Sequence, residues 1–145
     1  MMQNILVLCI GNICRSPMAE GLLKQALPNK TIRSAGLNAL IGHPADPFSV
    51  QLMAERGIDI SAHRAQNISL QLVRQADLIL TMDREQKKAV ESTYVESRGK
   101  VFRLGEFDNV DIADPYREGI DSFRTAYQLI DDGVKVFVQR LAQIA

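Results

Sequence analysis

The chain has 145 residues and 46% apolar side chains, which is typical of one globular domain that buries roughly 70% of its unfolded surface. Its 17 basic and 17 acidic side chains cancel, which argues against nucleic acid as a partner. No run of about 18 apolar residues occurs and the first residues lack a secretory pattern, so we expect neither membrane insertion nor export.

Apolar runs alternate with helical patterns along the first half of the chain. They predict a strand at 4–10, a helix at 16–27, a strand at 31–35 and a helix at 47–56. Ser16 is the expected N-cap of the first helix, with Pro17 in its first position. Gly57 is expected to end the second helix.

The second half continues the alternation. It predicts a short helix at 69–75, a strand at 77–82, a helix at 83–95, a strand at 100–104, a loop at 105–119 and a helix at 122–142. This order predicts an α/β fold: a single domain over residues 1–145, with a four-stranded parallel twisted sheet and helices on both faces. Ligands of such sheets bind beyond the carboxyl ends of the strands, and the first strand ends near Cys9.

The most informative segment runs from Cys9 to Pro17 and reads CIGNICRSP. Five residues separate Cys9 from Arg15, enough for backbone amides and a helix start to surround one tetrahedral anion. The planar fork of Arg15 matches two phosphate oxygens, and the same positive field favours the thiolate of Cys9. This thiolate is a candidate nucleophile that attacks phosphorus and forms a cysteinyl-phosphate. The expected phosphate-binding loop comprises Ile10, Gly11, Asn12, Ile13, Cys14 and Ser16.

A plain structural interpretation of Cys9 is a buried core cysteine at a strand end. A Cys-x5-Arg pattern alone is weak evidence, but here Gly11 and Asn12 lie inside it, between a strand and a helix. These additions favour the phosphate loop.

A nucleophile that expels a phenolate needs a proton donor, and Asp114 in Ala-Asp-Pro-Tyr is the candidate. Pro115 biases Asp114 toward an extended conformation, and Tyr116 offers an aromatic wall. Asp-Pro by itself is only a turn signal. Asp108 and Asp111 are competing candidates, which we interpret as solvated loop charges.

Residues 7–17 together with Asp114-Pro115-Tyr116 resemble the low-molecular-weight protein-tyrosine phosphatases, and the resemblance covers nearly the whole chain. It implies Cys9 as the nucleophile, Arg15 as the group that binds phosphate and the transition state, and Asp114 as acid and then base. It implies neither metal nor cofactor.

The resemblance also implies supporting roles. Ser16 would stabilise the thiolate, and Asn12, in a left-handed conformation, would hold the loop's shape together with Ser34 and His63. His63 as an ordinary hydrogen-bonded surface histidine is the alternative. Cys14 would form a reversible disulfide with Cys9 that limits oxidation, and plain packing is the alternative.

The walls of the substrate site are expected to be Ile13, Leu40 and Tyr116. The chain has no tryptophan near Leu40 and carries Arg117 after Tyr116, which resembles bacterial members of the family rather than eukaryotic ones. Those bacterial enzymes act on an autophosphorylated tyrosine kinase in polysaccharide production and export. Gln66 stands where relatives often carry arginine. Two cysteines without a disulfide framework indicate the reducing cytoplasm.

Three other functions stay open on the sequence. Arsenate reductases of this fold need further cysteines downstream, and none follows Cys14. Protein-arginine phosphatases of this fold tend to carry threonine at the position of Ile13. A non-catalytic phosphate-binding module would have no use for Cys9 or Asp114.

Overall fold

A computed structural model describes residues 2–144, so Met1 and Ala145 of the expected domain lie outside the described residues. The elements are β1 (Asn4–Cys9), α1 (Arg15–Ala26), β2 (Thr31–Gly36), α2 (Pro47–Glu55), α3 (Leu70–Gln75), β3 (Leu78–Thr81), α4 (Arg84–Thr93), η1 (Val95–Ser97), β4 (Val101–Arg103), η2 (Glu106–Asp108) and α5 (Ile120–Ile144). The predicted α/β class is confirmed. The two short 3-10 helices, η1 and η2, were not predicted.

The four strands form one parallel sheet in the order β2-β1-β3-β4, as predicted. The chain passes from β1 to β2 on one side and then returns to place β3 on the other side of β1. The connections therefore diverge at the carboxyl end of β1, which opens a crevice there. Cys9, the last residue of β1, lies at this point, opposite Gly36 of β2.

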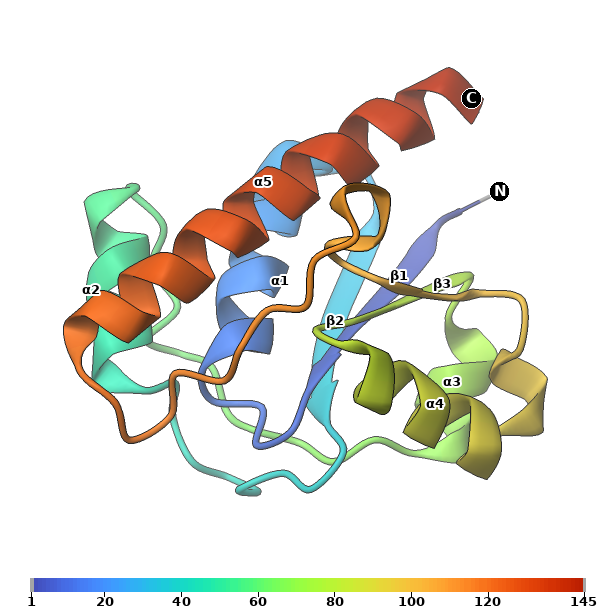
Figure 1. The fold of residues 1–145 in the computed structure, drawn as a ribbon, viewed down its shortest axis with the longest axis horizontal. Coiled ribbons are helices and arrows are strands. Elements are labelled where there is room, and N and C mark those ends of the chain that lie inside the picture. Colours follow the sequence, from blue (N-terminus) through green and yellow to red (C-terminus); the bar gives the residue numbers. More distant parts are fainter. Residues whose placement is uncertain (1, 145) are drawn as a thin grey trace.

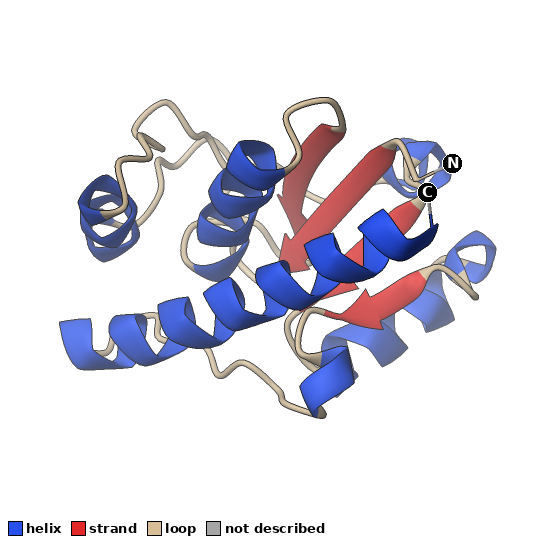
Figure 2. Cartoon of the chain, turned by 90° about the horizontal axis from the view of Figure 1, so that it is seen from above, coloured by secondary structure: helices blue, strands red, loops and turns tan. Residues whose placement is uncertain are grey.

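Helices cover both faces of the sheet, with α1, α2 and α5 on one side and α3 and α4 on the other (Figures 1 and 2). Successive side chains of a strand point to opposite faces. Accordingly, Ile5 and Val7 belong to the core under α1 and α5, whereas Leu6 and Leu8 belong to the core with α3 and α4. The central strand β1 is therefore buried on both sides.

One expected helix boundary is wrong. Ser16 is not the N-cap of α1, because the helix begins at Arg15 and its N-cap, Cys14, makes no side-chain capping bond. The Ser16 hydroxyl instead bonds inside the loop that precedes the helix. By contrast, side chains cap α2, α3 and α4 in the usual way. The start of α1 therefore keeps amides that no side chain caps.

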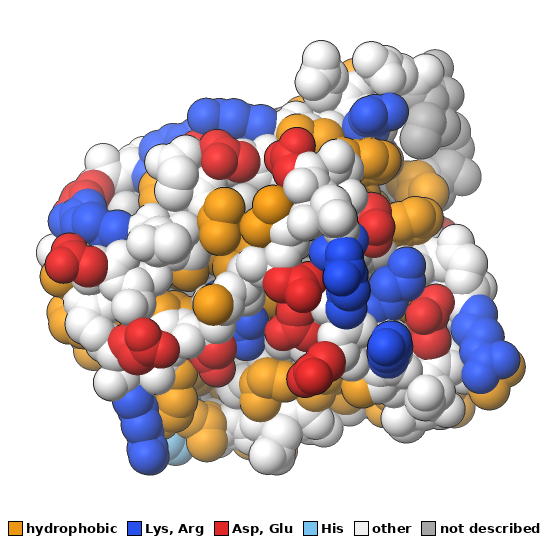
Figure 3. All heavy atoms as spheres, viewed as in Figure 1, with side chains coloured by type: hydrophobic (Ala, Val, Ile, Leu, Met, Phe, Trp, Pro, Cys, Tyr) orange, Lys and Arg blue, Asp and Glu red, His pale blue; other side chains and the backbone are white. Residues whose placement is uncertain are grey.

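Charged side chains of both signs are interspersed on the face shown in Figure 3, with no region of a single sign. Within residues 2–144, even the long helix α5 lacks the apolar stretch that crossing a bilayer requires.

Candidate active site

Surrounding segments of the chain donate hydrogen bonds to the carbonyl oxygens of the loop between β1 and α1. Each accepts a hydrogen bond from another part of the chain: Cys9 O from Leu37 N (2.9 Å), Ile10 O from Asn38 N (3.0 Å), Gly11 O from Leu40 N (3.0 Å), Asn12 O from His63 Nε2 (2.6 Å), Ile13 O from Asp46 N (2.8 Å) and Cys14 O from Ser49 Oγ (3.1 Å). In a trans peptide the N–H points opposite to the C=O, so the loop's amides point to its inside. Among the described residues, no group accepts a hydrogen bond from the amides of residues 11–14. They form a nest suited to an anion.

Cys9 lies against the inner hydroxyl of this loop. Its Sγ is 2.9 Å from Ser16 Oγ, and Asn12 Nδ2 donates to the same Oγ over 2.8 Å. Because Ser16 Oγ accepts from Asn12, its own proton is left to donate to the sulfur. A hydroxyl proton directed at the Cys9 sulfur is the arrangement that the predicted role of Ser16 requires.

Asn12 connects the loop to the rest of the protein. Its backbone is left-handed, with φ 60°, as expected, and its side chain is fully buried. Asn12 Nδ2 also donates to Ser34 Oγ (3.0 Å), and Asn12 Oδ1 accepts from Gln66 N (2.9 Å). The Asn12 carbonyl can only accept, so His63 Nε2 carries the hydrogen that it shares with that carbonyl. Asn12, Ser34 and His63 thus meet in one network.

Two members of this network were not predicted as site residues. Ser34 Oγ donates to Glu20 Oε1 over 2.5 Å, and the same carboxylate lies 3.9 Å from His63 Nδ1. Gln66, which stands where relatives often carry arginine, donates through Nε2 to the backbone oxygen of Ser34 over 3.0 Å. It therefore supports the same serine as Glu20. Glu20 follows Ser16 by one helical turn, and this spacing was the available signal.

Arg15 is 2% exposed and is oriented by two other loops. Its Nη1 donates to Ile112 O over 2.7 Å and lies 3.9 Å from Asp83 Oδ2, and its Nη2 lies 3.6 Å from Asp114 Oδ2. Its Nε is buried without a partner among the described residues. A buried donor without a partner is costly, so this arrangement favours an anion at the loop.

A cavity of about 190 Å³ opens above the loop. The predicted catalytic and wall residues meet in its lining, which comprises Cys9, Ile10, Gly11, Ile13, Cys14, Arg15, Asn38, Leu40, Asp114 and Tyr116. Ile10 and Asn38 were not predicted as wall residues. Ile13 is nearly buried, whereas Leu40 and Tyr116 are partly open to solvent. The charge of Arg15 suits the phosphate of an aromatic phosphate ester, and the apolar side chains of the lining suit its ring.

Asp114 is the loop carboxylate that reaches this cavity. Its Oδ1 accepts a hydrogen bond from Tyr116 N over 3.1 Å, and its side chain is 45% exposed. Asp111 instead pairs with Arg103 over 3.0 Å, and Asp108 lies exposed on η2. Neither competitor lines the cavity.

The two cysteines differ in their surroundings although both are buried free thiols. Burial, followed by the charge of Asp46, raises the pKa of the Cys14 thiol far above its usual value. Cys14 therefore stays protonated at neutral pH, and its redox role stays a prediction.

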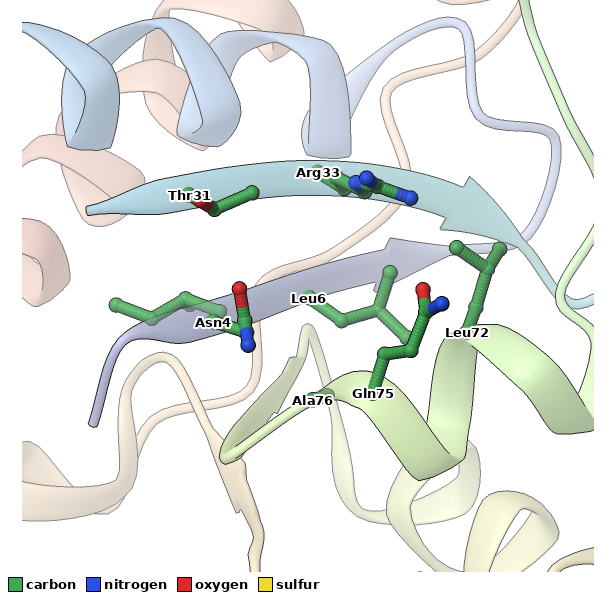
Figure 4. A pocket seen from close by; sticks show the side chains of 8 residues that line it. Asn4, Leu6, Thr31, Arg33, Leu72, Gln75 and Ala76 are labelled. Carbon is green, nitrogen blue, oxygen red and sulfur yellow. The ribbon is translucent and has the colours of Figure 1, made fainter. Parts of the chain in front are cut away.

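A second cavity lies under α3, on the face of the sheet that α3 and α4 cover, and has a volume of about 300 Å³ (Figure 4). Its lining includes Leu6, Arg33, Leu72 and Gln75 but neither a thiol nor a carboxylate. Its size exceeds that of the cavity at Cys9, but its chemistry offers no nucleophile. Within residues 2–144, no three His, Cys, Asp or Glu side chains gather in a way that could hold a metal ion.

Comparison with known proteins agrees with this geometry. The family model for low molecular weight phosphotyrosine protein phosphatase matches residues 4–144. The chain is 53% identical over 141 residues to the "Probable low molecular weight protein-tyrosine-phosphatase EpsP" of Ralstonia nicotianae, covering 97% of each chain.

Two solved structures are also similar to this chain in fold and sequence. Wzb of Vibrio vulnificus, in complex with benzylphosphonate, is similar with a TM-score of 0.93 and 40% identity, over 97% of this chain and 99% of that chain. The YwlE arginine phosphatase of Geobacillus stearothermophilus is similar with a TM-score of 0.90 and 30% identity, over 97% and 93%. A match that spans both the cysteine loop and the distant Asp114 leads to one conclusion: the chain belongs to the low molecular weight phosphotyrosine protein phosphatase family.

Proposed function

We propose that this protein hydrolyses phosphotyrosine in proteins through a cysteinyl-phosphate on Cys9. The observation that carries the proposal is that the Cys9 thiol and the Asp114 carboxyl line one cavity whose floor consists of inward amides and Arg15. A nucleophile, a proton donor and an anion cradle in one place are what phosphoryl transfer through an enzyme thiolate requires.

In the first step, the Cys9 thiolate attacks phosphorus, an S–P bond forms and the P–O bond to the tyrosine ring breaks. Asp114 gives its proton to the departing phenolate oxygen. Arg15 and the loop amides bind the oxygens on which charge is spread as the phosphoryl group moves. The Ser16 hydroxyl donates a hydrogen bond to the sulfur and keeps its own proton, an interaction that favours the thiolate as the attacking form.

In the second step, the Asp114 carboxylate takes a proton from water, and the water oxygen attacks phosphorus. The S–P bond breaks, which returns the Cys9 thiolate and releases inorganic phosphate. No oxidant, metal or second protein enters this sequence, and Asp114 ends protonated for the next turnover.

The apolar rim favours an aryl ester over a phosphoguanidinium group. Ile13, Leu40 and Tyr116 offer two aliphatic side chains and one ring around the opening. YwlE, a relative named as an arginine phosphatase, makes phosphoarginine the second candidate substrate.

We propose further that the physiological substrate is an autophosphorylated tyrosine kinase that serves polysaccharide production and export, and that the protein works in the cytoplasm. The similarity to EpsP and Wzb supports the first statement. The two free thiols, both close to the reacting centre, support the second, because an oxidising compartment would threaten them.

The test is rapid acid quenching during turnover of a phosphotyrosine peptide, followed by a search for phosphorus on Cys9. We expect a phosphorylated peptide containing Cys9. A parallel panel of phosphotyrosine, phosphoarginine and arsenate is expected to show turnover of the first well above the others. Turnover without any phosphocysteine contradicts the mechanism, and a preference for phosphoarginine contradicts the substrate.

A further inference from the structure

Arg117, next to the wall residue Tyr116, has an unusual backbone. Glu118 N donates to Pro115 O over 2.9 Å, which closes a turn whose third residue, Arg117, has φ 66°. This pattern is a type II turn, in which glycine or asparagine is the usual third residue. A long side chain with positive φ is strained, and such strain is most often kept where function needs the side chain.

The Arg117 side chain lies against one wall residue of the cavity. Arg117 Cζ is 5.2 Å from the centre of the Tyr116 ring, within the range of a cation–π contact. Tyr116 itself lines the cavity above Cys9. The turn and the ring contact therefore place a guanidinium group next to a wall of the cavity that a phosphotyrosine would enter.

This guanidinium forms no ion pair with a carboxylate among the described residues. The two acidic residues nearest in sequence have other partners: Asp114 lies against Arg15, and Glu118 Oε1 accepts from Ser122 Oγ over 3.0 Å. The rim residues Leu40 and Ile10 carry no charge. The charged residues of the cavity lining, Arg15 and Asp114, lie against each other, so Arg117 offers a positive charge beside the cavity wall that no carboxylate among the described residues neutralises.

We propose that Arg117 is a specificity residue that recognises a carboxylate side chain next to the phosphotyrosine of the substrate protein. This inference rests on the proposed phosphotyrosine hydrolysis. An extended peptide advances about 3.3 Å per residue, so the side chain of a flanking residue reaches the neighbourhood of Tyr116 and Arg117. An exposed ion pair of this kind corresponds to about a two- to fivefold preference, which salt weakens.

The experiment compares kcat/KM for three phosphotyrosine peptides that differ only in flanking residues, which are glutamate, glutamine or lysine. The protein is expected to prefer the glutamate peptide about two- to fivefold over the glutamine peptide at low salt, and less at about 0.5 M salt. Arg117→Gly should bring this ratio close to one. Glycine adopts positive φ without strain, so this variant should keep or raise the melting temperature.

Charge reversal provides the second variant. Arg117→Glu should invert the preference, so that the lysine peptide becomes the better substrate. Lys30→Glu, the same reversal in the turn before β2 at the opposite end of the sheet, should keep the original ratio. Equal rates on all three peptides with the unchanged protein, or an unchanged ratio in both Arg117 variants, overturn the role of Arg117. Failure to hydrolyse any phosphotyrosine peptide overturns the proposed function itself.

Discussion

Two loops face each other across the cavity, and they are held in different ways. In the loop of residues 10–14, residues 12–14 are buried, the carbonyls of the loop accept from partners between residues 38 and 63, and the Asn12 side chain bonds to Ser16, Ser34 and Gln66. The loop of residues 104–119 is mostly exposed, and Asp114 is held locally by the amide of Tyr116. The exposed side-chain fractions are 2% for Arg15 and 45% for Asp114.

This difference indicates that the two loops suit different functions. A nest of amides must be preorganised, because amides that turn only when the ligand arrives lose much of their electrostatic benefit. An acid must instead meet both a leaving group and, later, a water molecule, so partial exposure suits it. We therefore expect substitution of Arg15 or Asn12 to lower both rate and stability, and substitution of Asp114 to lower rate alone.

Cys9→Ser should give the largest effect. Removing the nucleophile is expected to lower kcat roughly 10⁶-fold, while phosphate binding, measured by calorimetry, persists because the amides and Arg15 remain. Cys14→Ser, the same change at the loop's other cysteine, is the control and should retain turnover. Substantial turnover by the Cys9 variant would contradict the nucleophile assignment.

Arg15→Lys tests whether a positive charge at this position is enough for catalysis. Lysine keeps the charge but loses the planar fork, so kcat should fall roughly 10³- to 10⁵-fold. The lost bond to Ile112 O should also lower the melting temperature. Arg64→Lys, at an exposed site, serves as the control. A near-normal rate would mean that the fork geometry is unimportant.

Asp114→Asn addresses the exposed loop. Loss of the general acid should slow the first step roughly 10²- to 10⁴-fold, with little change in melting temperature. The loss should shrink for aryl phosphates whose leaving group needs no proton. Asp111→Asn, in the same loop, breaks the pair with Arg103 and should spare the rate. Equal losses for all leaving groups would argue against an acid role.

Asn12→Gly separates hydrogen bonding from backbone conformation, because glycine tolerates φ 60° without strain. It leaves Ser16 and Ser34 without their donor, so we expect the free energy of unfolding to fall by about 1–3 kcal/mol, measured by urea titration. The rate should fall with it, because the Ser16 proton is no longer directed at Cys9. An unchanged stability would show that the network is not what holds the loop.

The two thiols should differ in alkylation by iodoacetate. Burial raises the pKa of Cys14, so its reactive thiolate is scarce from neutral pH up to well above the usual cysteine range. Peptide mapping at pH 7 is therefore expected to find the label on Cys9, with no rise at Cys14 as pH increases toward 9. Added phosphate should protect Cys9. Equal labelling of both residues would contradict the different surroundings.

Much of the fold was predictable because its signals are local. The alternating strands and helices follow from apolar periodicity, and the parallel sheet follows from their order. The N-cap of α1 was wrong, since Ser16 matches a capping residue locally but its hydroxyl bonds to Cys9 and Asn12. A rule that assigns the N-cap from the local sequence takes no account of hydrogen-bond partners that lie outside the helix.

The sequence by itself determined which groups are candidates for the reaction: a cysteine and an arginine at loop spacing, and an Asp-Pro-Tyr segment whose hydrogen bond is local. Only the tertiary structure decided that the amides of residues 11–14 point inward and that Glu20 and Gln66 support Ser34. It also decided that Arg117 stacks on Tyr116 with no carboxylate partner within residues 2–144. The physical reason is the range of each contact. Backbone preferences act between neighbours, whereas the partners of the phosphate loop come from distant segments that only the closed sheet brings together.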